Sequence, residues 1–362
     1  MLGLQAVGQL VERCCWHKLA VSSHKLAVSS HKLAVNMSSA SRPRVFISRR
    51  IPEEGRALVA TACEVQSWES DEPPPRGEYL RAVAGVDGLL CLLTDPVNEE
   101  LLDAAGPNLK VVSTMSVGYD HIDVKECARR NVKVGYTPGI LTSATAELTV
   151  ALLLATSRRL KEGIRAVENG EWGTWKPMWL CGPGLEGATV GIVGFGRIGV
   201  TVGQCLKPFG VASFLYHDSL EKPVEARDLG AEYVSFDSLL ARSDFVVACC
   251  ALTAETRNLF NASAFQKMKT SAVFVNTSRG GVVNQDDLII ALQSGQIGAA
   301  GLDVTTPEPL PTDSPLLKLD NCVVLPHIAS ATHKTRAAMA VLAANNLLAG
   351  LRGDPLPQEV HV

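Results

Sequence analysis

Three polar side chains with complementary chemistry lie in the second half of the chain. Arg279, Glu308 and His327 each follow, by a few residues, an apolar run with the length of a strand. A loop after a strand can present a polar side chain to a cleft. Reduction of a keto group by hydride needs a fixed carboxylate, a hydride donor and a proton for the developing alkoxide. The three residues therefore predict a site for this chemistry if folding brings their loops together.

Each of the three side chains suits one part of the reaction. Arg279 can bind a substrate carboxylate with its guanidinium fork, which fixes the keto carbon for attack. His327 can donate the proton, and a neighbouring Glu308 carboxylate would favour the imidazolium form, so that an acid is available near neutral pH. The alternative is that Arg279 and Glu308 only form salt bridges at the surface.

A glycine-rich segment predicts where a dinucleotide binds. The sequence GFGRIG at residues 194–199 follows an apolar run and precedes a helical pattern. In this setting Gly194 permits a tight turn, Gly196 lets the backbone approach a pyrophosphate, and Gly199 lets the helix pack closely on the strand. The alternative is a glycine turn of any α/β domain. An acid about twenty residues further on, Asp218, favours the dinucleotide.

The choice between the two nicotinamide cofactors depends on Asp218. A carboxylate at the end of this strand would accept hydrogen bonds from the adenosine ribose and repel a 2′-phosphate, which favours NAD. However, His217 lies between Tyr216 and Asp218, and a shift of one residue would turn the carboxylate away from the ribose. Both cofactors therefore stay open.

Strand and helix patterns alternate along the chain, which favours parallel sheets with crossover helices. The expected strands are 44–48, 86–93, 109–113, 188–194, 214–216, 245–250, 272–276, 299–304 and 323–325, and the expected helices include 53–62 and 145–160. The six strands that begin at residue 188 suit a complete dinucleotide-binding fold.

Composition limits the other classes of function. The 362 residues suggest two domains, and a formal net charge of −3 gives no basic surface for nucleic acid or for an anionic membrane. We therefore expect neither partner. We also expect that no segment crosses a membrane, since none is long and apolar enough to span a bilayer. The ten cysteines are scattered without a Cys-x-x-Cys spacing, so we expect no metal site and infer a reducing compartment.

Residues 1–42 are expected to be a disordered extension. The unit HKLAVSS repeats from His17, and its third, shortened copy ends at Val35. Its serines and basic residues are also typical of a mitochondrial transit peptide, whereas the segment that begins at Met37 suits a cytosolic protein. We predict a cytoplasmic location, with the mitochondrial alternative left open.

Several motifs resemble those of the D-isomer-specific 2-hydroxyacid dehydrogenases. They are the glycine-rich segment 194–199, the turn 276–280, the strand end 301–304 with Glu308 and Pro309, and the dipeptide Pro326–His327. The similarity runs from about Arg44 to the C-terminus. Within this family, the segments most similar to the reductases of glyoxylate and hydroxypyruvate are 115–118, 175–177, 265–269 and 343–351.

The resemblance implies an NAD(P)-dependent oxidoreductase that reduces glyoxylate and hydroxypyruvate to glycolate and D-glycerate. The substrate-binding residues that it implies are Val117, Gly118, Arg279, Asp303, His327, Ser330 and Trp175. The cofactor-binding residues that it implies are Gly194, Gly196, Arg197, Ile198, Gly199, Asp218, Ser219, Ala251, Leu252, Thr253, Thr277, Asp303 and Ala329. Trp175 would close the pocket of a neighbouring copy, because family members form dimers through this region.

Two positions depart from the family pattern. Gly281 stands where similar reductases often carry an acid, and Asp218 with Ser219 stands where NADPH-preferring relatives carry Gly and Arg. By resemblance NADP(H) remains the first choice of cofactor, with NAD(H) as the alternative because of Asp218.

The implied architecture is α/β, with two Rossmann-like domains and a cofactor domain inserted into a discontinuous substrate domain. The expected substrate domain comprises residues 43–138 and 329–362, and the expected cofactor domain comprises residues 139–328. Two other functions remain open, a dehydrogenase of another D-2-hydroxy acid and a dinucleotide-sensing binding protein of the corepressor type.

Overall fold

Two parallel sheets form the framework of the computed structural model, which describes residues 41–361. The first sheet has five strands in the order β2-β1-β3-β4-β5. Its strands are β1 (Arg44–Ile47), β2 (Glu64–Ser67), β3 (Gly88–Cys91), β4 (Val111–Thr114) and β5 (Lys133–Gly135). All its neighbouring strands run parallel.

The second sheet has seven parallel strands in the order β12-β11-β10-β9-β6-β7-β8. They are β6 (Thr189–Val193), β7 (Ser213–His217), β8 (Glu232–Tyr233), β9 (Phe245–Ala248), β10 (Val273–Asn276), β11 (Ala299–Leu302) and β12 (Cys322–Val324). The order reverses beside β6, and in such sheets ligands bind at the carboxyl ends of the strands near the reversal.

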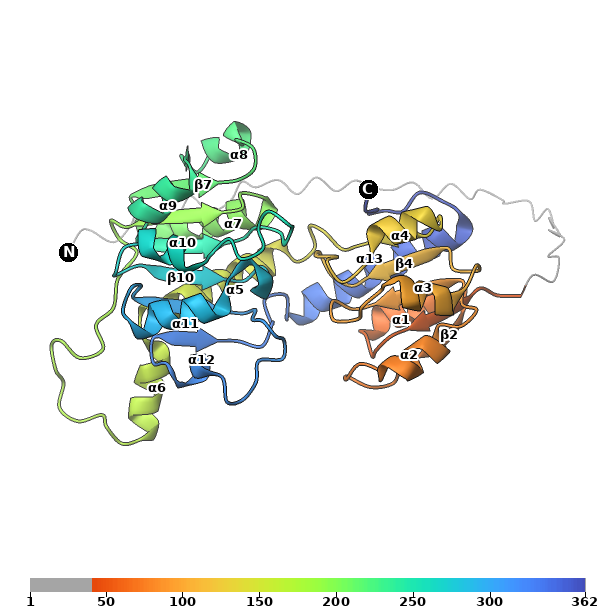
Figure 1. The fold of residues 1–362 in the computed structure, drawn as a ribbon, viewed down its shortest axis with the longest axis horizontal. Coiled ribbons are helices and arrows are strands. Elements are labelled where there is room, and N and C mark those ends of the chain that lie inside the picture. The colour runs from red at the N-terminus through yellow and green to blue at the C-terminus, as the bar shows by residue number, and fades with distance from the viewer. Residues whose placement is uncertain (1–40, 362) are drawn as a thin grey trace, which may run out of the picture. The chain divides into compact units, whose positions relative to one another are not determined.

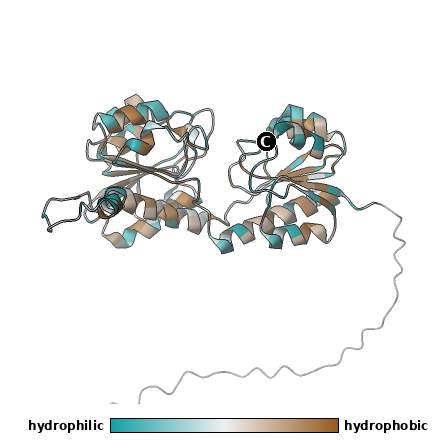
Figure 2. Ribbon diagram, turned by 90° about the horizontal axis from the view of Figure 1, so that it is seen from below, coloured by the Kyte–Doolittle hydropathy of each residue, from teal (hydrophilic) through white to brown (hydrophobic). Residues whose placement is uncertain are grey.

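Helices cover both faces of each sheet, as Figure 1 shows. This explains why β3, β4, β9 and β10 are mainly apolar runs in which every residue is buried. Figure 2 shows the hydrophobic residues concentrated along the sheets and on the sides of the helices that meet them. The predicted α/β class with parallel sheets is confirmed.

The helices of the first sheet come from both ends of the chain. They are α1 (Glu53–Ala60), α2 (Arg76–Ala82), α3 (Glu99–Ala105), α4 (Val124–Arg129) and the C-terminal α13 (His333–Arg352). Helix α13 packs on α1 and on strands β3 and β4. A Cβ at Gly55 would lie 2.7 Å from the Ala340 backbone, so glycine allows this close approach. The predicted discontinuous arrangement is therefore confirmed, while its exact boundaries stay a prediction.

The remaining helices belong to the second sheet. They are α5 (Thr142–Ser157), α6 (Leu160–Glu168), α7 (Arg197–Leu206), α8 (Pro223–Arg227), α9 (Phe236–Arg242), α10 (Ala262–Lys267), α11 (Gln285–Gln293) and α12 (Pro315–Lys318), with short 3-10 helices at Lys207–Phe209 and Gly280–Val282. Helix α5 packs on α7, β10 and β11, which explains its apolar composition. The Thr149 hydroxyl on this helix lies 2.7 Å from that of Thr277, directly after β10.

Short polar side chains begin several helices. Each accepts a hydrogen bond from the backbone N–H three residues further on, which satisfies a donor that the helix leaves free. These N-cap residues are Asn98, Asp123, Ser235, Asn261, Asn284 and Thr332. The last of them fixes the start of α13 directly after the His327 loop.

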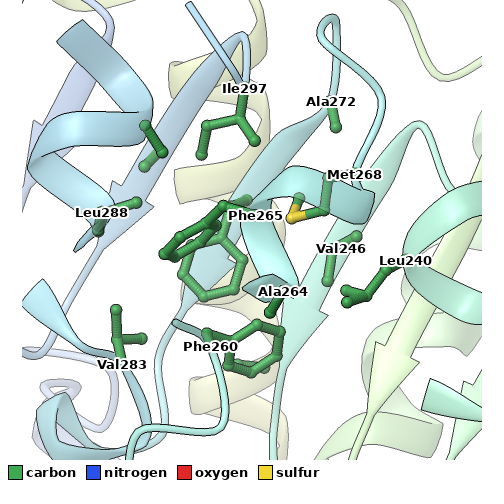
Figure 3. Packing of buried hydrophobic residues seen from close by; sticks show 14 of the residues in the cluster. Leu240, Val246, Phe260, Ala264, Phe265, Met268, Ala272, Val283, Leu288 and Ile297 are labelled. Carbon is green, nitrogen blue, oxygen red and sulfur yellow. The ribbon is translucent and has the colours of Figure 1, made fainter. Parts of the chain in front are cut away.

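Aromatic rings fill the core of the second sheet beneath α10 and α11. Figure 3 shows Phe260 and Phe265 packed among aliphatic side chains there. Their ring centroids lie 4.8 Å and 5.9 Å, respectively, from that of Phe274 on β10. Burial of one such side chain stabilises the fold by about 2 to 3 kcal/mol, so this cluster gives the strand-end loops a rigid base.

Sequence patterns missed three strands. One of them lies after residue 188, so the prediction of six strands there was wrong. The seventh strand, β8, has only two residues, both exposed. Strand β2 alternates between exposed polar residues and the half-buried Val65 and Ser67, and β5 has three residues. Each lies at a sheet edge, where less burial weakens the apolar signal. The predictions for the first forty residues lie outside the described part of the chain.

Candidate active site

A cavity of about 320 Å³ lies where loops of both sheets meet. Its walls come from the ends of β3, β4, β9, β10 and β12 and from the first turns of α13. The predicted site residues that line it are Val117, Gly118, Ile198, Ala251, Leu252, Thr253, Thr277, Arg279, His327, Ala329 and Ser330. Residues that are far apart in the sequence thus share one cavity.

His327 and Glu308 form a pair at this cavity. His327 Nδ1 lies 2.8 Å from Glu308 Oε2, and both side chains are only partly exposed. Because Glu308 takes the Nδ1 side of the ring, Nε2 is left for a ligand. His327 has a left-handed φ of 56°, which turns its side chain away from the strand direction of β12.

Asp303 fixes the backbone that carries His327. Its carboxylate is fully buried and accepts the N–H groups of Ile328 and Ala329, each at 2.8 Å. Its carbonyl oxygen accepts the N–H of His327, also at 2.8 Å. Asp303 is therefore separated from the cavity by the loop that it holds. The resemblance had implied that it contacts substrate and cofactor.

The surroundings of the two carboxyl groups shift their pKa values in opposite directions. Burial alone would raise the pKa of Glu308, but the hydrogen bond and charge of His327 lower it below its ordinary value. Burial raises the pKa of Asp303, and the N–H groups of Ile328 and Ala329 oppose that rise only in part. Glu308 is thus the ionised partner of the imidazole near neutral pH.

Arg279 lies opposite, between loops of the two sheets. Its Nε donates to Asp120 Oδ1 at 2.9 Å and its Nη1 donates to the Ser278 carbonyl at 2.9 Å. Burial alone would raise the pKa of Asp120, but the charge and hydrogen bond of Arg279 outweigh it and lower the pKa. A Cβ at Gly118 would collide with Arg279 Nη2. The guanidinium therefore rests against the backbone of a residue that lines the cavity.

Hydrogen bonds stiffen the loop that carries Val117 and Gly118. The Ser116 hydroxyl donates to the Gly118 carbonyl at 2.7 Å and contacts the Thr114 hydroxyl at 2.8 Å. Thr114 in turn lies 3.1 Å from His121 Nε2. Burial lowers the pKa of His121 to about 4, against the opposing charge of Asp120. The neutral imidazole of His121 thus supports the loop of Val117 and Gly118 through Thr114.

The glycine-rich segment has the geometry of a phosphate cradle. Gly194 has a φ of 89° and packs against the backbone of Cys250, and a Cβ at Gly199 would collide with the Gly194 carbonyl. A Cβ at Gly196 would meet open space, so the backbone there is free for a ligand. Gly196 and Arg197, at the start of α7, also line a second cavity of about 600 Å³. These features fit a dinucleotide pyrophosphate at the helix N-terminus.

Asp218 binds groups of its own chain. One carboxylate oxygen accepts the Phe195 N–H at 2.8 Å and lies 3.1 Å from Lys222 Nζ, and the other accepts the Ser219 N–H at 2.7 Å. Burial alone would raise the pKa of Asp218, but Lys222 and the N–H of Phe195 lower it. The side chain thus supports the glycine-rich turn, and Lys222 places a cation beside it.

Trp175 is a predicted substrate residue that does not line the cavity of its own chain. Its side chain is 81% exposed, and it follows α6 on a segment that does not line the 320 Å³ cavity. Its predicted role toward a second copy stays a prediction.

Sequence reasoning missed two charged residues of the site, Asp120 and Arg336. Asp120 lies only two residues after Gly118, so an acid next to a predicted carboxylate-binding loop was an available signal for a partner of Arg279. Arg336 lies near the start of α13 and lines the cavity, but nothing in the sequence separates it from an exposed helical arginine.

Within residues 41–361, no group of three or more His, Cys, Asp or Glu side chains is arranged to hold a metal ion. In the same part of the chain, no helix combines the length and apolar composition needed to cross a membrane.

Comparison with known proteins decides the family. Residues 150–329 match the family described as D-isomer specific 2-hydroxyacid dehydrogenase, NAD binding domain. The chain is 60% identical over 321 residues to the glyoxylate reductase/hydroxypyruvate reductase of Homo sapiens, which covers 88% of this chain and 98% of the human one. The chain belongs to the D-isomer-specific 2-hydroxyacid dehydrogenases.

Other members of this dehydrogenase family support the same fold. The glyoxylate reductase of Thermofilum pendens is 46% identical, covering 89% of this chain and 95% of its own. The crystal structure of a glyoxylate reductase from Paecilomyes thermophila matches with a TM-score of 0.79 at 30% identity, covering 88% of this chain and 98% of that one.

A structure with a bound cofactor also matches this dehydrogenase. The NADPH-dependent glyoxylate/hydroxypyruvate reductase from Sinorhizobium meliloti, in complex with NADP and malonate, has a TM-score of 0.77 at 31% identity, covering 88% of this chain and 97% of that one. The predicted family, fold and use of an NAD(P) cofactor are therefore confirmed.

Proposed function

We propose that this dehydrogenase reduces glyoxylate to glycolate and hydroxypyruvate to D-glycerate. The observation that carries the proposal is that Arg279 and His327 line one cavity together with Ile198 of the glycine-rich segment, and that His327 is paired with Glu308. The substrate class follows the printed activity of the human relative, which is 60% identical over nearly its whole length. A bound nicotinamide cofactor supplies the hydride for this reaction.

In this proposal the residues of the cavity divide the work. The backbone N–H groups of Val117 and Gly118 and the Arg279 guanidinium bind the substrate carboxylate, which fixes the keto carbon. His327 Nε2 donates the proton to the developing alkoxide, and Glu308 stabilises the imidazolium before the transfer. Residues 43–138 and 329–362 would form the substrate domain, and residues 139–328 the cofactor domain.

The proposed cofactor is NADPH, with NADH also accepted. Asp218 alone would repel a 2′-phosphate, but its oxygens already accept hydrogen bonds from Phe195, Ser219 and Lys222. The ammonium group of Lys222 supplies a positive charge at the same place. Comparison of kcat/KM for NADPH and NADH tests this. Exclusive use of NADH would reject the proposal.

The proposed assembly is a homodimer. Apolar side chains of helix α6 and the segment after it are at least half exposed, and such patches mark interaction surfaces. They are Leu160, Ile164, Val167, Trp172, Trp175 and Met178. Sedimentation equilibrium of the wild type and of Trp175→Ser would test the dimer. A wild type that sediments as a monomer at micromolar concentration would reject it.

The proposed location is the cytoplasm. The eight cysteines of the described chain are all free thiols, which agrees with a reducing compartment. Cell fractionation with an antibody against the protein tests this, and enrichment in mitochondria would favour the alternative.

Initial rates test the activity directly. The protein is expected to oxidise NADPH only after glyoxylate or hydroxypyruvate is added, and to act more slowly on a panel of other 2-keto acids. A faster rate with another keto acid would reassign the substrate. Cofactor binding without turnover on any keto acid would instead favour a dinucleotide-sensing protein.

A further inference from the structure

Three polar side chains form a hydrogen-bonded row behind the loop that carries Val117 and Gly118. His121 Nε2 lies 3.1 Å from the Thr114 hydroxyl, which lies 2.8 Å from the Ser116 hydroxyl. The Ser116 hydroxyl in turn donates to the Gly118 carbonyl at 2.7 Å. Thr114 and Ser116 are both buried, so these hydrogen bonds are shielded from water.

The number of protons in this row fixes its direction. A serine or threonine hydroxyl has a single proton to donate. Ser116 gives its proton to a carbonyl, so it accepts from Thr114, and Thr114 accepts from the Nε2–H of His121. Burial lowers the pKa of His121 to about 4, so the neutral ring carries its one proton on Nε2. Within residues 41–361, the buried Nδ1 of this ring has no hydrogen-bond partner, and in this tautomer it has no proton that needs one.

The hydrogen bond of Ser116 orients the peptide that joins Gly118 to Tyr119. The two sides of a planar trans peptide point in opposite directions, so the Tyr119 N–H points away from the row while the Gly118 carbonyl points into it. Within residues 41–361, no acceptor binds the N–H groups of Val117, Gly118 and Tyr119. All three residues line the cavity, where these donors suit a carboxylate.

Gly118 makes this orientation necessary to enforce. The missing Cβ leaves room for the Arg279 guanidinium, but glycine also lets the adjacent peptide turn over more easily than other residues do. A reversed peptide would present the Gly118 carbonyl to the cavity and remove the Tyr119 N–H from it. A partly negative oxygen would then face the substrate carboxylate.

We propose, on the basis of the proposed function, that Ser116 is a positioning residue for the substrate carboxylate. Its hydroxyl holds the Gly118 carbonyl away from the cavity, and Thr114 and His121 keep that hydroxyl donating in this one direction. Arg279 supplies the charge that attracts the carboxylate, whereas the row keeps the neighbouring backbone in the orientation that donates hydrogen bonds.

The test compares glyoxylate with its uncharged amide, glyoxylamide, in Ser116→Ala. A carboxylate only accepts hydrogen bonds, whereas an amide group also donates them, so a carbonyl that turns toward the cavity opposes the acid and not the amide. We expect kcat/KM to fall about 10-fold for glyoxylate, mainly through KM, and to change less than about threefold for glyoxylamide. The Kd of NADPH should stay at the wild-type value. If the amide reacts too slowly for a rate, competitive inhibition by oxamate and by oxamide gives the same comparison.

Thr137→Val is the matched control. Its backbone N–H donates to the Ser116 carbonyl at 2.8 Å, but within residues 41–361 its buried hydroxyl has no partner. Removal of this hydroxyl should therefore leave the preference for acid over amide unchanged. Thr114→Val should lower that preference about threefold, since Ser116 keeps its proton but loses the donor that fixes its direction, and Thr114→Ser should restore it.

Two results would overturn the proposal. One is an equal loss for glyoxylate and glyoxylamide in a Ser116→Ala protein that unfolds at the wild-type temperature, and the other is an unchanged preference for the acid in that protein. If the alanine variant does not fold, the comparison of Thr114→Val with Thr114→Ser decides alone. Failure of the wild type to reduce any keto acid would instead reject the proposed function itself.

Discussion

The two sides of the active-site cavity hold their functional side chains in different ways. On the His327 side, the histidine, its partner Glu308 and the supporting Asp303 all follow strands of the second sheet. On the Arg279 side, the arginine follows the second sheet while its partner Asp120 follows the first. His327 is thus fixed by contacts within one domain, whereas Arg279 is fixed by a contact between two.

This difference suggests a division between chemistry and binding. A group held within one rigid domain keeps its orientation whether or not the domains are closed, which suits proton transfer. A group held by a contact across the domains is sensitive to their relative positions, which suits a step that responds to the substrate. Substitutions on the two sides should therefore change different kinetic constants.

Replacement of His327 by Ala should have the largest effect. We expect kcat to fall by about 10²- to 10⁴-fold, the range for a positioned general acid, while the Kd of NADPH changes little because the glycine-rich turn is untouched. Single-turnover rates and fluorescence titration of the cofactor measure the two quantities. Wild-type turnover in this variant would remove the proposed proton donor.

Replacement of Arg279 by Ala should act mainly on binding. The variant loses the fork that binds the carboxylate, so we expect the KM of the keto acid to rise by about 100-fold, with a smaller fall in kcat from poorer alignment. Arg242→Ala, which removes an exposed ion pair with Glu232, is the matched control. If kcat fell as in the His327 variant while KM stayed constant, Arg279 would not act mainly in substrate binding.

Replacement of Asp120 by Asn tests the contact between the domains. The guanidinium would keep its place against Gly118 and the Ser278 carbonyl but lose the carboxylate that orients Nε. We expect KM to rise about tenfold and kcat to stay within about threefold. Rescue by Asp120→Glu would identify a positioning role, whereas equal defects in both variants would indicate general damage to the loop.

The last prediction concerns stability and not turnover, and it depends on His121, which packs beside the loop that carries Val117 and Gly118. Its pKa of about 4 in the folded protein lies below the ordinary value of 6.5, so the unfolded chain binds the proton first. The contribution of the neutral His121 to the free energy of unfolding is complete above pH 6.5. It is lost as the pH falls toward 4, by up to about 3 kcal/mol. Urea unfolding of the wild type and of His121→Gln at pH 7 and pH 5 measures it. An equal loss of stability in both proteins would exclude His121 as the cause.

The sequence was most informative where strands are buried and loops follow them. Arg279, Glu308 and His327 were found because each follows an apolar run, and residues 194–199 because glycine spacing reflects backbone geometry. The edge strands β2, β5 and β8 were missed, since short or half-exposed strands lack a continuous apolar pattern. Local signals thus predicted the centre of each sheet better than its edges.

Partners across the fold were harder to predict. Asp120 lies far from Arg279 in the sequence, and its role depends on how two domains meet. The orientation of Asp218 depends on the N–H of Phe195 and on Lys222, so its residue type alone could not decide between support of the turn and contact with the ribose. Arg336 faces a cavity only because of the rotation of α13, which a pattern of alanines does not specify.

The packing of α13 has a consequence for the order in which the protein is made. Strands β1 to β5 are synthesised early, yet the helix that covers one face of β3 and β4 is residues 333–352. During synthesis on the ribosome, the apolar face of β3 and β4 stays exposed to solvent until α13 emerges, while the second domain can already fold. The chain is therefore most prone to aggregation during synthesis, before α13 has been made.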